Sequence, residues 1–475
     1  MKTKIVATLG PASSSPEMLR QLMLAGVNVF RLNFSHSSHG SHREAIDNIR
    51  ALNIELNLHT AILADLQGPK IRIGIMENGQ AQLPEGHRLI FTNKECTCTA
   101  DRLYITYPDF AADVKPGEDI ILDDGKLLMR VIETNGADEV KAEVIHGGIL
   151  SSKKGVNLPN TRVSMPSLTA KDLTDLQFAL HNRVNWIALS FVRRAQDILQ
   201  LREEIARSVP EGYSPKIIAK IEKPEAVENM DEIIALSDGI MVARGDLGVE
   251  LPLEQVPLVQ KTLVNKCLAA AKPVIIATQM MEGMISNIRP TRAEVNDVAN
   301  SVLDGADALM LSGETSVGMF PVQVVGTMKK IIGEVEEYQD VYNKRHMPDE
   351  TGKERLISDA VLYSACNIAC ESNARAIIAM THTGYSAGRI SSQRPKQDIY
   401  IFSNNHELLC MLNLLWGVNG IFYDNIVTST SKTLRALTDK LIDDGLIKPG
   451  DLLVFAASTP IYVSGKTNML KLAYA

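Results

Sequence analysis

The chain has 475 residues, of which 45% are hydrophobic and 22% charged, and its formal net charge is −7. This length and ordinary globular balance predict roughly two to four domains. The acidic balance and the lack of a long Lys/Arg run argue against a nucleic-acid partner. Bound anions must therefore be met by local clusters of positive charge.

The N-terminal sequence MKTKIVATLG predicts a strand rather than a signal peptide, and no apolar segment is long enough to span a membrane. Six cysteines are scattered without a CxxC pair, although Cys366 and Cys370 have the i, i+4 spacing of a helix face. We interpret them as thiols of a reducing compartment rather than as a metal or disulfide site, and we expect a cytoplasmic protein without a membrane partner.

Eight short apolar runs recur along the chain and read as buried strands, at 4–10, 28–34, 60–66, 185–191, 216–222, 239–246, 273–279 and 308–314. Segments with helical periodicity separate them, for example at 15–26, 168–180 and 292–305. Eight β-α units with nearly continuous apolar strands predict a parallel (β/α)8 barrel, a TIM barrel, formed by residues 1–69 and 167–340.

The third unit is interrupted by a different kind of sequence at 70–166, with strand-like runs broken by Gly, Asn and Asp at 88–92, 119–124, 127–133 and 140–146. We interpret this insertion as a small β-barrel domain that forms a lid over the active-site face, with Pro69 and Pro166 as hinge markers. Residues 341–475 alternate helices with strands at 374–380, 398–403, 420–424 and 451–456. They predict a separate, open α/β domain.

The most informative motif is Lys220-Ile-Glu222, followed by Arg244-Gly-Asp246. Since side chains two residues apart share one face of a strand, each motif is expected to present a cation and a carboxylate together. Two carboxylates with a lysine between them can seat a divalent metal and a transferring phosphoryl group. The alternative is a pair of structural salt bridges at strand ends.

Polar residues gather at the carboxyl ends of the predicted barrel strands, the face that carries the active sites of such barrels. They are Arg31, Asn33, Ser35, Asp65, Lys220, Glu222, Arg244, Asp246, Thr278, Ser312 and Glu314. This clustering favours catalysis over random polarity.

The C-terminal domain contains THTGYSAGR at 381–389, a loop between a predicted strand and a predicted helix. Its hydroxyls, its glycine and its backbone N–H groups suit one phosphate, with Lys466 as an added charge. The residues expected to bind an effector are Thr381, Thr383, Gly384 and Ser386. An ordinary capped turn remains the alternative.

Together these motifs resemble the pyruvate kinase family over essentially the whole chain. The matching segments are TKIVATLGPAS, NVFRLNFSH, DLQGPKIR, LDDG, KKGVNLP, IIAKIEKPEAV, DGIMVARGDLGVE, ATQMMEGMI, PTRAEVNDVANSVLDGADALMLSGET and GKTN. The resemblance implies transfer of the phosphoryl group of phosphoenolpyruvate to ADP, giving pyruvate and ATP in glycolysis. The enolate formed on the way would be stabilised by a divalent ion and then protonated.

Carried onto this chain, the resemblance implies that Glu222 and Asp246 hold Mg²⁺ or Mn²⁺, which keeps open positions for substrate oxygens. Lys220 would neutralise the phosphoryl group in flight. Arg31 would clamp the phosphate, and Arg72 would serve the phosphates from the hinge of the lid.

The substrate carboxylate would lie against the backbone of Gly245, which has no side chain to prevent a close approach, and beside Asp246. Thr278 would lie near the enolate methylene and assist its protonation, with Ser312 and Glu314 in support.

The resemblance places the nucleotide phosphates against Asn33, Ser35, His36, Arg72 and Lys154. His36, with His39 and His42 nearby, also suggests a metal site, but we favour a solvated helix start in which His36 alone meets the nucleotide. Lys154 could equally belong to a charged turn.

Many members of the family require K⁺, bound by Asn, Ser, Asp and Thr. Three of these ligands match as Asn33, Ser35 and Asp65, but the Thr position is Leu66. Lys70 stands where K⁺-dependent members have Glu, as in the K⁺-independent branch. We therefore expect no requirement for K⁺. The resemblance also implies a homotetramer, and it makes residues 341–475 a regulatory domain that binds a phosphorylated sugar or nucleotide.

Two other functions were weighed. A barrel lyase or aldolase acting on phosphoenolpyruvate or pyruvate would share the metal carboxylates, but it has no need of Arg31, Lys220 and a lid that carries Lys154. A non-catalytic effector-binding protein would have no need of the complete set of polar residues at the strand ends. An assay for pyruvate formation with and without ADP separates these functions.

Overall fold

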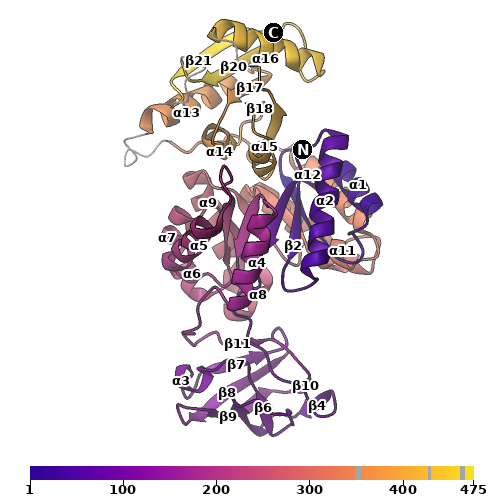
Figure 1. Ribbon diagram of the computed structural model, residues 1–475, viewed down its shortest axis with the longest axis vertical. Coiled ribbons are helices and arrows are strands. Elements are labelled where there is room, and N and C mark those ends of the chain that lie inside the picture. Colours follow the sequence, from indigo (N-terminus) through magenta and orange to yellow (C-terminus); the bar gives the residue numbers. More distant parts are fainter. Residues whose placement is uncertain (348–354, 426–428, 460–465) are drawn as a thin grey trace.

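A computed structural model describes residues 1–347, 355–425, 429–459 and 466–475. It has three parts along one axis, with the barrel in the middle, the inserted domain at one end and the C-terminal domain at the other (Figure 1). No helix among the described residues is long and apolar enough to cross a membrane.

The predicted barrel is confirmed as eight parallel strands that close in the order β1-β16-β15-β14-β13-β12-β3-β2. The strands are β1 (Lys4–Thr8), β2 (Val29–Asn33), β3 (Ala61–Asp65), β12 (Trp186–Leu189), β13 (Lys216–Ile221), β14 (Gly239–Ala243), β15 (Val274–Ala277) and β16 (Ala308–Leu311). Each falls within one of the predicted apolar runs, because both faces of these strands are buried.

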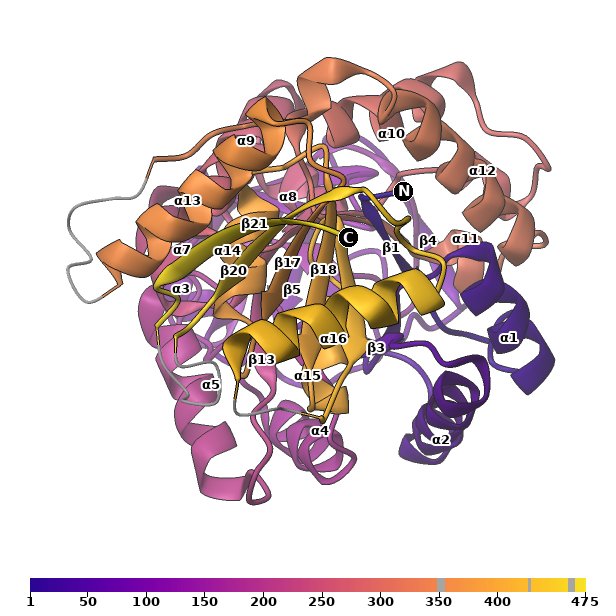
Figure 2. The same cartoon turned by 90° about the horizontal axis from the view of Figure 1, so that it is seen from above.

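Helices surround the barrel strands when the molecule is seen from above (Figure 2). The main ones are α1 (Pro16–Ala25), α2 (His39–Leu56), α4 (Ala170–His181), α5 (Ala195–Ser208), α7 (Met230–Leu236), α9 (Val256–Ala270), α10 (Arg292–Asp304) and α12 (Pro321–Val335). Short helices follow several strands on the active-site side: α6 (Pro224–Glu228), α8 (Arg244–Glu250) and α11 (Gly313–Ser316).

Local sequence sets the starts of these helices. The Thr169 side chain accepts from the backbone N–H of Asp172, whose carboxylate accepts from the backbone N–H of Thr169. Thr291 and Glu294 form the same reciprocal box at α10. Such boxes satisfy N–H groups that the first helical turn leaves unpaired.

The inserted domain has its own hydrophobic core, which includes Phe91, Tyr107 and Phe110. Its six-stranded sheet has the order β11-β7-β8-β9-β5-β6, and a separate pair joins β10 to β4. The strands are β4 (Gln80–Leu83), β5 (Arg88–Thr92), β6 (Arg102–Tyr104), β7 (Asp119–Leu122), β8 (Leu127–Thr134), β9 (Glu139–His146), β10 (Gly148–Ser151) and β11 (Val156–Asn157), with a short helix, α3 (Phe110–Asp113). We call this part the lid; the four strands predicted for it are present, and four others of two to four residues are additional.

The C-terminal domain is a five-stranded sheet in the order β19-β18-β17-β20-β21. Its elements are α13 (Leu356–Glu371), β17 (Ala376–Met380), α14 (Tyr385–Ser392), β18 (Asp398–Ser403), α15 (His406–Leu412), β19 (Val418–Phe422), α16 (Thr430–Asp443), β20 (Leu452–Ala457) and β21 (Met469–Tyr474). The four predicted strands run parallel to one another, whereas β21 was not predicted and runs antiparallel to β20.

The C-terminal domain closes the floor of the barrel. Met411 and Leu414 belong to the apolar cluster that fills the barrel interior, together with Trp186 and Ile218 from the strands. The floor of the barrel is thus packed against the C-terminal domain, and its other end faces the lid.

Candidate active site

A cavity of about 100 Å³ opens at the carboxyl ends of the barrel strands, where the sequence placed the active site. Its lining comes from several strands and the loops that follow them. It consists of Arg31, Asn33, Ser35, His36, Asp65, Leu66, Gln67, Lys70, Ser190, Phe191, Lys220, Glu222 and Asp246.

Lys220 lies at the centre of this cluster, near the end of β13. Its ammonium group is 2.8 Å from Glu222 Oε1 and 3.3 Å from Asp65 Oδ1. Burial favours the neutral amine, but the carboxylates of Asp65 and Glu222 outweigh burial and raise the pKa of Lys220. The ammonium ion is therefore fully charged at neutral pH, as a group that meets a phosphoryl oxygen must be.

Arg31, near the end of β2, is fixed by two polar contacts. Its Nε donates to Asp65 Oδ2 at 2.6 Å, and Nη1 donates to Thr8 Oγ1 at 3.1 Å. Burial would raise the pKa of Asp65, but the charges of Lys220 and Arg31 lower it instead. Asp65 thus stays ionised and holds the two cations side by side at the cavity.

Glu222 is 1% exposed and has both carboxylate oxygens engaged. One oxygen pairs with Lys220, and the other accepts from the backbone N–H of Phe191 at 2.6 Å. Burial raises the pKa of Glu222, and although Lys220 opposes this, the charge of Asp246 adds to it. Two carboxylates that repel each other in one cavity are a natural place for a cation.

The chemistry of the donor set fits a divalent ion. Glu222 and Asp246 both line the cavity, and no ion pair joins Asp246 to any of the residues that the structure describes. Mg²⁺ is usually bound through one or two protein carboxylates, with substrate and water oxygens completing its coordination. These two side chains would hold the ion, and it would supply positive charge to the substrate oxygens.

The prediction that Arg244 and Asp246 share one face of a strand is wrong. β14 ends at Ala243, and the short helix α8 starts at Arg244. Arg244 forms a two-pronged ion pair with Asp297, at 2.6 and 2.7 Å, and its Nη2 donates to the carbonyl of Thr278. Arg244 therefore forms a structural salt bridge, the alternative raised for this motif, while Asp246 lines the cavity.

Gly245 and Thr278 meet beside this cavity without lining it. The backbone N–H of Gly245 donates to Thr278 Oγ1 at 2.6 Å. Thr278 has φ of 69° and Gln279 φ of 55°, conformations that cost about 1–3 kcal/mol and that cluster at functional sites. The backbone is thus strained directly after β15, at the threonine that the sequence analysis expected to assist protonation of the enolate.

Glu314 and Ser312 act together behind Thr278. Glu314 is 2% exposed; one oxygen accepts from the backbone N–H of Met281 at 3.1 Å and the other from that of Ser312 at 2.7 Å. The carboxylate is thus held by the loops that follow β15 and β16. This arrangement supports the geometry of the site, and Ser312 Oγ is buried with no partner among the described residues.

The residues expected to contact the nucleotide phosphates lie in two places, the cavity and the lid. Asn33, Ser35 and His36 line the cavity. Arg72 and Lys154 lie on the lid and do not line it: Arg72 Nη1 donates to the carbonyl of Lys153 at 2.9 Å, and Lys154 pairs with Asp123 at 2.7 Å. Burial, then the charges of Lys70, Arg72 and Arg31, lower the pKa of His36, so its ring is neutral at pH 7.

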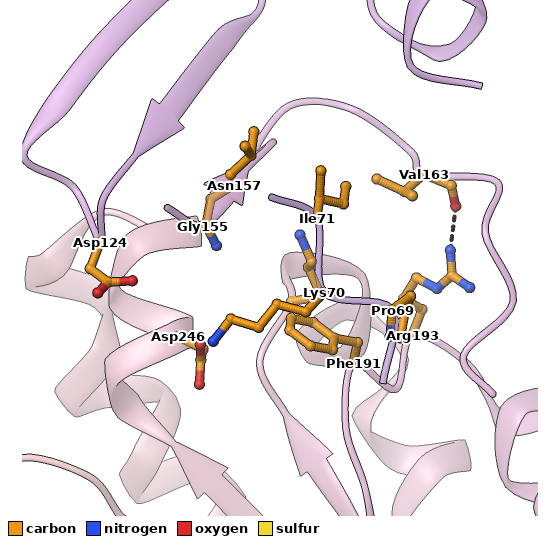
Figure 3. A pocket seen from close by; sticks show the side chains of 12 residues that line it. Pro69, Lys70, Ile71, Asp124, Gly155, Asn157, Val163, Phe191, Arg193 and Asp246 are labelled. Carbon is orange, nitrogen blue, oxygen red and sulfur yellow. Dashed lines mark hydrogen bonds between the residues drawn. The ribbon is translucent and has the colours of Figure 1, made fainter. Parts of the chain in front are cut away.

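The residues at the K⁺-binding positions and the lysine expected to replace K⁺ lie in the same cavity. Asn33, Ser35, Asp65 and Lys70 all line it, together with Leu66. Lys70 also lines a second small cavity, of about 40 Å³, between the lid and the barrel. Figure 3 shows its side chain extending from the start of the lid toward Asp246.

Contacts between the lid and the barrel surround this second cavity. Arg193 donates to the carbonyls of Val163 (Figure 3) and Met165 in the segment that returns from the lid to the barrel. Asn157 of the lid donates to Glu250 Oε1 at 2.8 Å, and Glu250 also pairs with Lys223 at 2.6 Å. Since Lys223 follows Glu222 and Glu250 ends α8, which contains Asp246, these contacts connect the lid to both segments that carry the predicted metal ligands.

The predicted effector loop lies in the C-terminal domain, far along the chain from this site. Gly384 has φ of 84°, and its N–H donates to Thr381 Oγ1 at 2.9 Å. Ser386 Oγ lies 3.1 Å from Thr467 Oγ1. A cavity of about 70 Å³ is lined by Thr381, Thr383, Ser386 and Lys466, but not by Gly384.

Ser190 is a cavity residue that the sequence did not identify. Its hydroxyl accepts from the Lys220 ammonium at 2.8 Å and donates to the carbonyl of Leu66 at 2.7 Å. Its position directly after the apolar run of β12 is the one signal that could have drawn attention to it, because every neighbouring strand carries a polar residue there.

Comparison with known proteins identifies the family that this chain resembles. The model "Pyruvate kinase, barrel domain" matches residues 1–325, and "Pyruvate kinase, alpha/beta domain" matches residues 359–473. The chain is 43% identical to the pyruvate kinase of Geobacillus stearothermophilus over 474 residues, which cover 99% of this chain and 80% of that protein. It is 44% identical to pyruvate kinase 2 of Synechocystis sp., with 99% and 78% covered.

Among solved structures, a pyruvate kinase from Cryptosporidium parvum aligns with a TM-score of 0.92 at 34% identity. The alignment covers 100% of this chain and 96% of that one.

Proposed function

The chain belongs to the pyruvate kinase family, and from that membership we propose roles for the residues of its active site. The enzyme transfers the phosphoryl group of phosphoenolpyruvate to ADP, giving pyruvate and ATP in glycolysis, and it depends on a divalent metal ion. The observation that supports the assignment of roles best is the Lys220 ammonium, held between Glu222 and Asp65 at the active-site cavity.

Glu222 and Asp246 hold Mg²⁺, or Mn²⁺, in this proposal. When bound, the ion would supply positive charge for the developing enolate. Phe191 orients Glu222 through its backbone N–H, so that one carboxylate oxygen keeps a fixed direction. Gly245 offers a backbone free of side chain for the substrate carboxylate, next to Asp246.

Lys220 and Arg31 act on the phosphoryl group. Both are held by Asp65, which spaces their positive charges along one side of the cavity. Arg31 binds the phosphate in the ground state, and Lys220 neutralises charge as the phosphoryl group moves toward ADP.

Thr278 assists protonation of the enolate, with Ser312 and Glu314 in support. The left-handed backbone of Thr278 supports this role, because the strain presents its hydroxyl toward Gly245 rather than along the strand. The proton comes from a water that Thr278 orders or from the hydroxyl itself.

Asn33, Ser35 and His36 contact the ADP phosphates from the barrel, and Arg72 and Lys154 contact them from the lid. Movement of the lid would bring Lys154 to the phosphates. Asp123 would then lose its ion pair with Lys154 but keep the one with Lys126, whose ammonium group lies 3.1 Å from its carboxylate. The negative charge of Asp123 would therefore stay paired.

Lys70 replaces K⁺ beside Asn33, Ser35 and Asp65. We further propose that the protein is a cytoplasmic homotetramer with neither nucleic acid nor membrane as a partner. A phosphorylated sugar or nucleotide binds the loop formed by Thr381, Thr383, Gly384 and Ser386. Its binding raises the affinity for phosphoenolpyruvate, by a coupling of about 1–3 kcal/mol. Calorimetry with sugar phosphates on wild type and Ser386→Asp tests the loop, and equal binding to both proteins would leave it a capped turn.

Pyruvate formation from phosphoenolpyruvate, measured through a coupled dehydrogenase with and without ADP, tests the assigned activity. We expect pyruvate and ATP in equal amounts, only with ADP and a divalent ion, and loss of both products in Glu222→Gln. Pyruvate formed at the same rate without ADP would contradict phosphoryl transfer to the nucleotide.

A further inference from the structure

A cavity of about 430 Å³ lies on the floor of the barrel, at the opposite end from the active site, and we call it the barrel-floor pocket. Its barrel side comes from the starts of four adjacent strands. Trp186 and Lys216 are the first residues of β12 and β13, while Asp238 and Pro273 directly precede β14 and β15. Its other side comes from α14, α15 and Leu415 of the C-terminal domain.

The same four strands carry the proposed catalytic machinery at their other ends. Ser190 follows β12, Lys220 belongs to β13, Asp246 lies in the helix that follows β14, and Thr278 follows β15. Lys216 and Lys220 are four residues apart on one strand, about 13 Å at the usual rise of a strand. A ligand on the barrel floor would therefore touch the starts of all four catalytic strands.

The pocket is positively charged, in a chain whose net charge is −7. Four cations line it, Lys216, Lys272, Arg355 and Arg389, against one lining carboxylate, Asp238. That carboxylate is already shared, since it lies 3.5 Å from Lys216 and 2.9 Å from Arg202.

Arg355 is the cation most available to a ligand. Its guanidinium lies 4.2 Å from the ring centroid of Tyr385, and no carboxylate in the described part of the chain pairs with it. Arg389 stacks on the same ring at 5.5 Å and pairs with Asp359 at 3.3 Å. The two guanidinium groups thus hold positive charge at one wall of the pocket, where a phosphate would be attracted.

Apart from Thr383 and Tyr385, the remaining side chains that line the pocket are apolar. The indole N–H of Trp186 donates to the carbonyl of Met411 at 3.3 Å, which fixes the ring between the barrel and α15. The pocket is also lined by Leu408, Leu412 and Leu415. These three side chains and those of Trp186 and Met411 are all buried. An apolar base with a few charged groups at its rim is typical of sites for small organic ligands.

We propose that the barrel-floor pocket binds an organic phosphate carrying a flat, largely apolar ring system, and that binding there changes the affinity of the active site for phosphoenolpyruvate. The phosphate meets Arg355, Arg389 and Lys216, and the ring lies on Trp186 and the leucines. The part of this inference that concerns the active site rests on the proposed function; the binding itself does not.

The barrel-floor pocket is a different cavity from the one at Thr381 and Ser386, although Thr383 and Gly384 of the predicted effector loop line it. Arg355, Thr383 and Tyr385 line both cavities. Thr381 lines only the cavity of the loop, and Lys216 lines only the barrel-floor pocket. Substitutions at these two positions can therefore tell the sites apart.

Titration calorimetry with 1-naphthyl phosphate, without substrates, tests the site. We expect saturable binding to wild type, with 1-naphthol and inorganic phosphate each binding at least tenfold more weakly, because the pocket recognises ring and charge together. Lys216→Ala and Arg389→Ala should each weaken binding about tenfold. Thr381→Ala, and Lys440→Ala as a control on the surface helix α16, should bind as wild type does, and melting curves check that each variant is folded.

Equal binding to wild type and Lys216→Ala, or loss of binding in Thr381→Ala alone, would overturn the proposal. Displacement of 1-naphthyl phosphate by adenosine monophosphate assigns nucleotides as the source of the ligand, and failure to displace it assigns simple aryl phosphates.

The link to the active site is measured by the KM for phosphoenolpyruvate at increasing 1-naphthyl phosphate. We expect a change of threefold or more in wild type and none in Lys216→Ala. The same change in both proteins would place the effect elsewhere and overturn the coupling. An inactive enzyme that still binds the ligand would refute the proposed function but not the pocket.

Discussion

Ser190 accepts a hydrogen bond of 2.8 Å from the ammonium group of Lys220, although the two residues come from different strands. The serine hydroxyl has two acceptors for its single proton, the carbonyl of Leu66 at 2.7 Å and Asp65 Oδ1 at 3.4 Å. The oxygen lone pairs are therefore free to face Lys220, and the lysine is held on three sides by Ser190, Asp65 and Glu222.

Ser190→Ala should lower kcat about tenfold and change the KM for phosphoenolpyruvate little. A hydrogen bond to a charged group contributes about 1.5–3 kcal/mol, and the two carboxylates still hold the ammonium group. Steady-state kinetics check this, with Ser391→Ala as the matched control: Ser391 is a buried serine that donates to the carbonyl of Trp416 at 2.7 Å, away from the active site. Equal losses in both variants would mean a general effect on packing.

Lys220→Met should lower kcat by orders of magnitude with a much smaller effect on the KM for phosphoenolpyruvate, because its charge matters most during phosphoryl transfer. Exchange of the pyruvate methyl protons with solvent deuterium, followed by NMR, is expected to persist, since enolisation relies on the metal site rather than on the lysine. A change confined to KM would make Lys220 only a binding residue.

Wild type should be highly active in a buffer whose only monovalent cation is a bulky organic ammonium. Lys70 provides a tethered positive charge in the region of Asn33, Ser35 and Asp65, and Leu66 has no side-chain oxygen for K⁺. Lys70→Glu should lower activity in that buffer, and K⁺ should restore it in part. The rate of wild type against K⁺ at fixed ionic strength decides the matter, and an activation of about tenfold or more, equal to about 1.4 kcal/mol, would show that Lys70 does not replace the ion.

Lys4→Met should stabilise the folded protein at pH 7. Lys4 is 5% exposed and donates to the carbonyl of Val418 at 2.8 Å, and burial lowers its pKa from 10.5 to about 8. A shift of that size corresponds to a penalty of about 3 kcal/mol. The unfolded chain binds the proton up to about pH 10.5, so the penalty applies fully below pH 8 and fades between pH 8 and 10.5.

Urea unfolding of wild type and Lys4→Met at several pH values checks this. The stability gained by the substitution should be largest near pH 7 and shrink as the pH rises toward 10. A constant difference across that range would mean that the lysine carries no penalty for its charge.

The barrel could be predicted from the sequence because parallel strands buried on both faces read as continuous apolar runs. The same reasoning failed just beyond the strands. Arg244 and Asp246 were assigned to one face by strand alternation, but α8 starts at Arg244 and turns the two side chains apart. Alternation says nothing about where a strand stops.

Short or exposed strands gave weak signals. β6 and β11 have three and two residues, and β21 has no fully buried side chain, so none stands out as an apolar run. The antiparallel position of β21 depends on pairing with β20 and not on its own sequence.

The residues of the active-site cavity were identified to the extent that each lies in a recognisable motif. Ser190 was missed because its partner Lys220 is thirty positions away, and only the closed barrel brings them together. The lid positions of Arg72 and Lys154 also depend on how the inserted domain packs on the barrel, which no local pattern specifies.

The most direct test of the account is the kcat of Asp246→Asn with phosphoenolpyruvate and ADP at saturating Mg²⁺. The substitution keeps the size of the side chain and removes one charge from the proposed metal site, so the fold should survive. We predict a fall of about a hundredfold or more, the scale found when an electrostatic stabiliser of a transition state is removed. A folded Asp246→Asn enzyme with near-normal turnover would contradict the account.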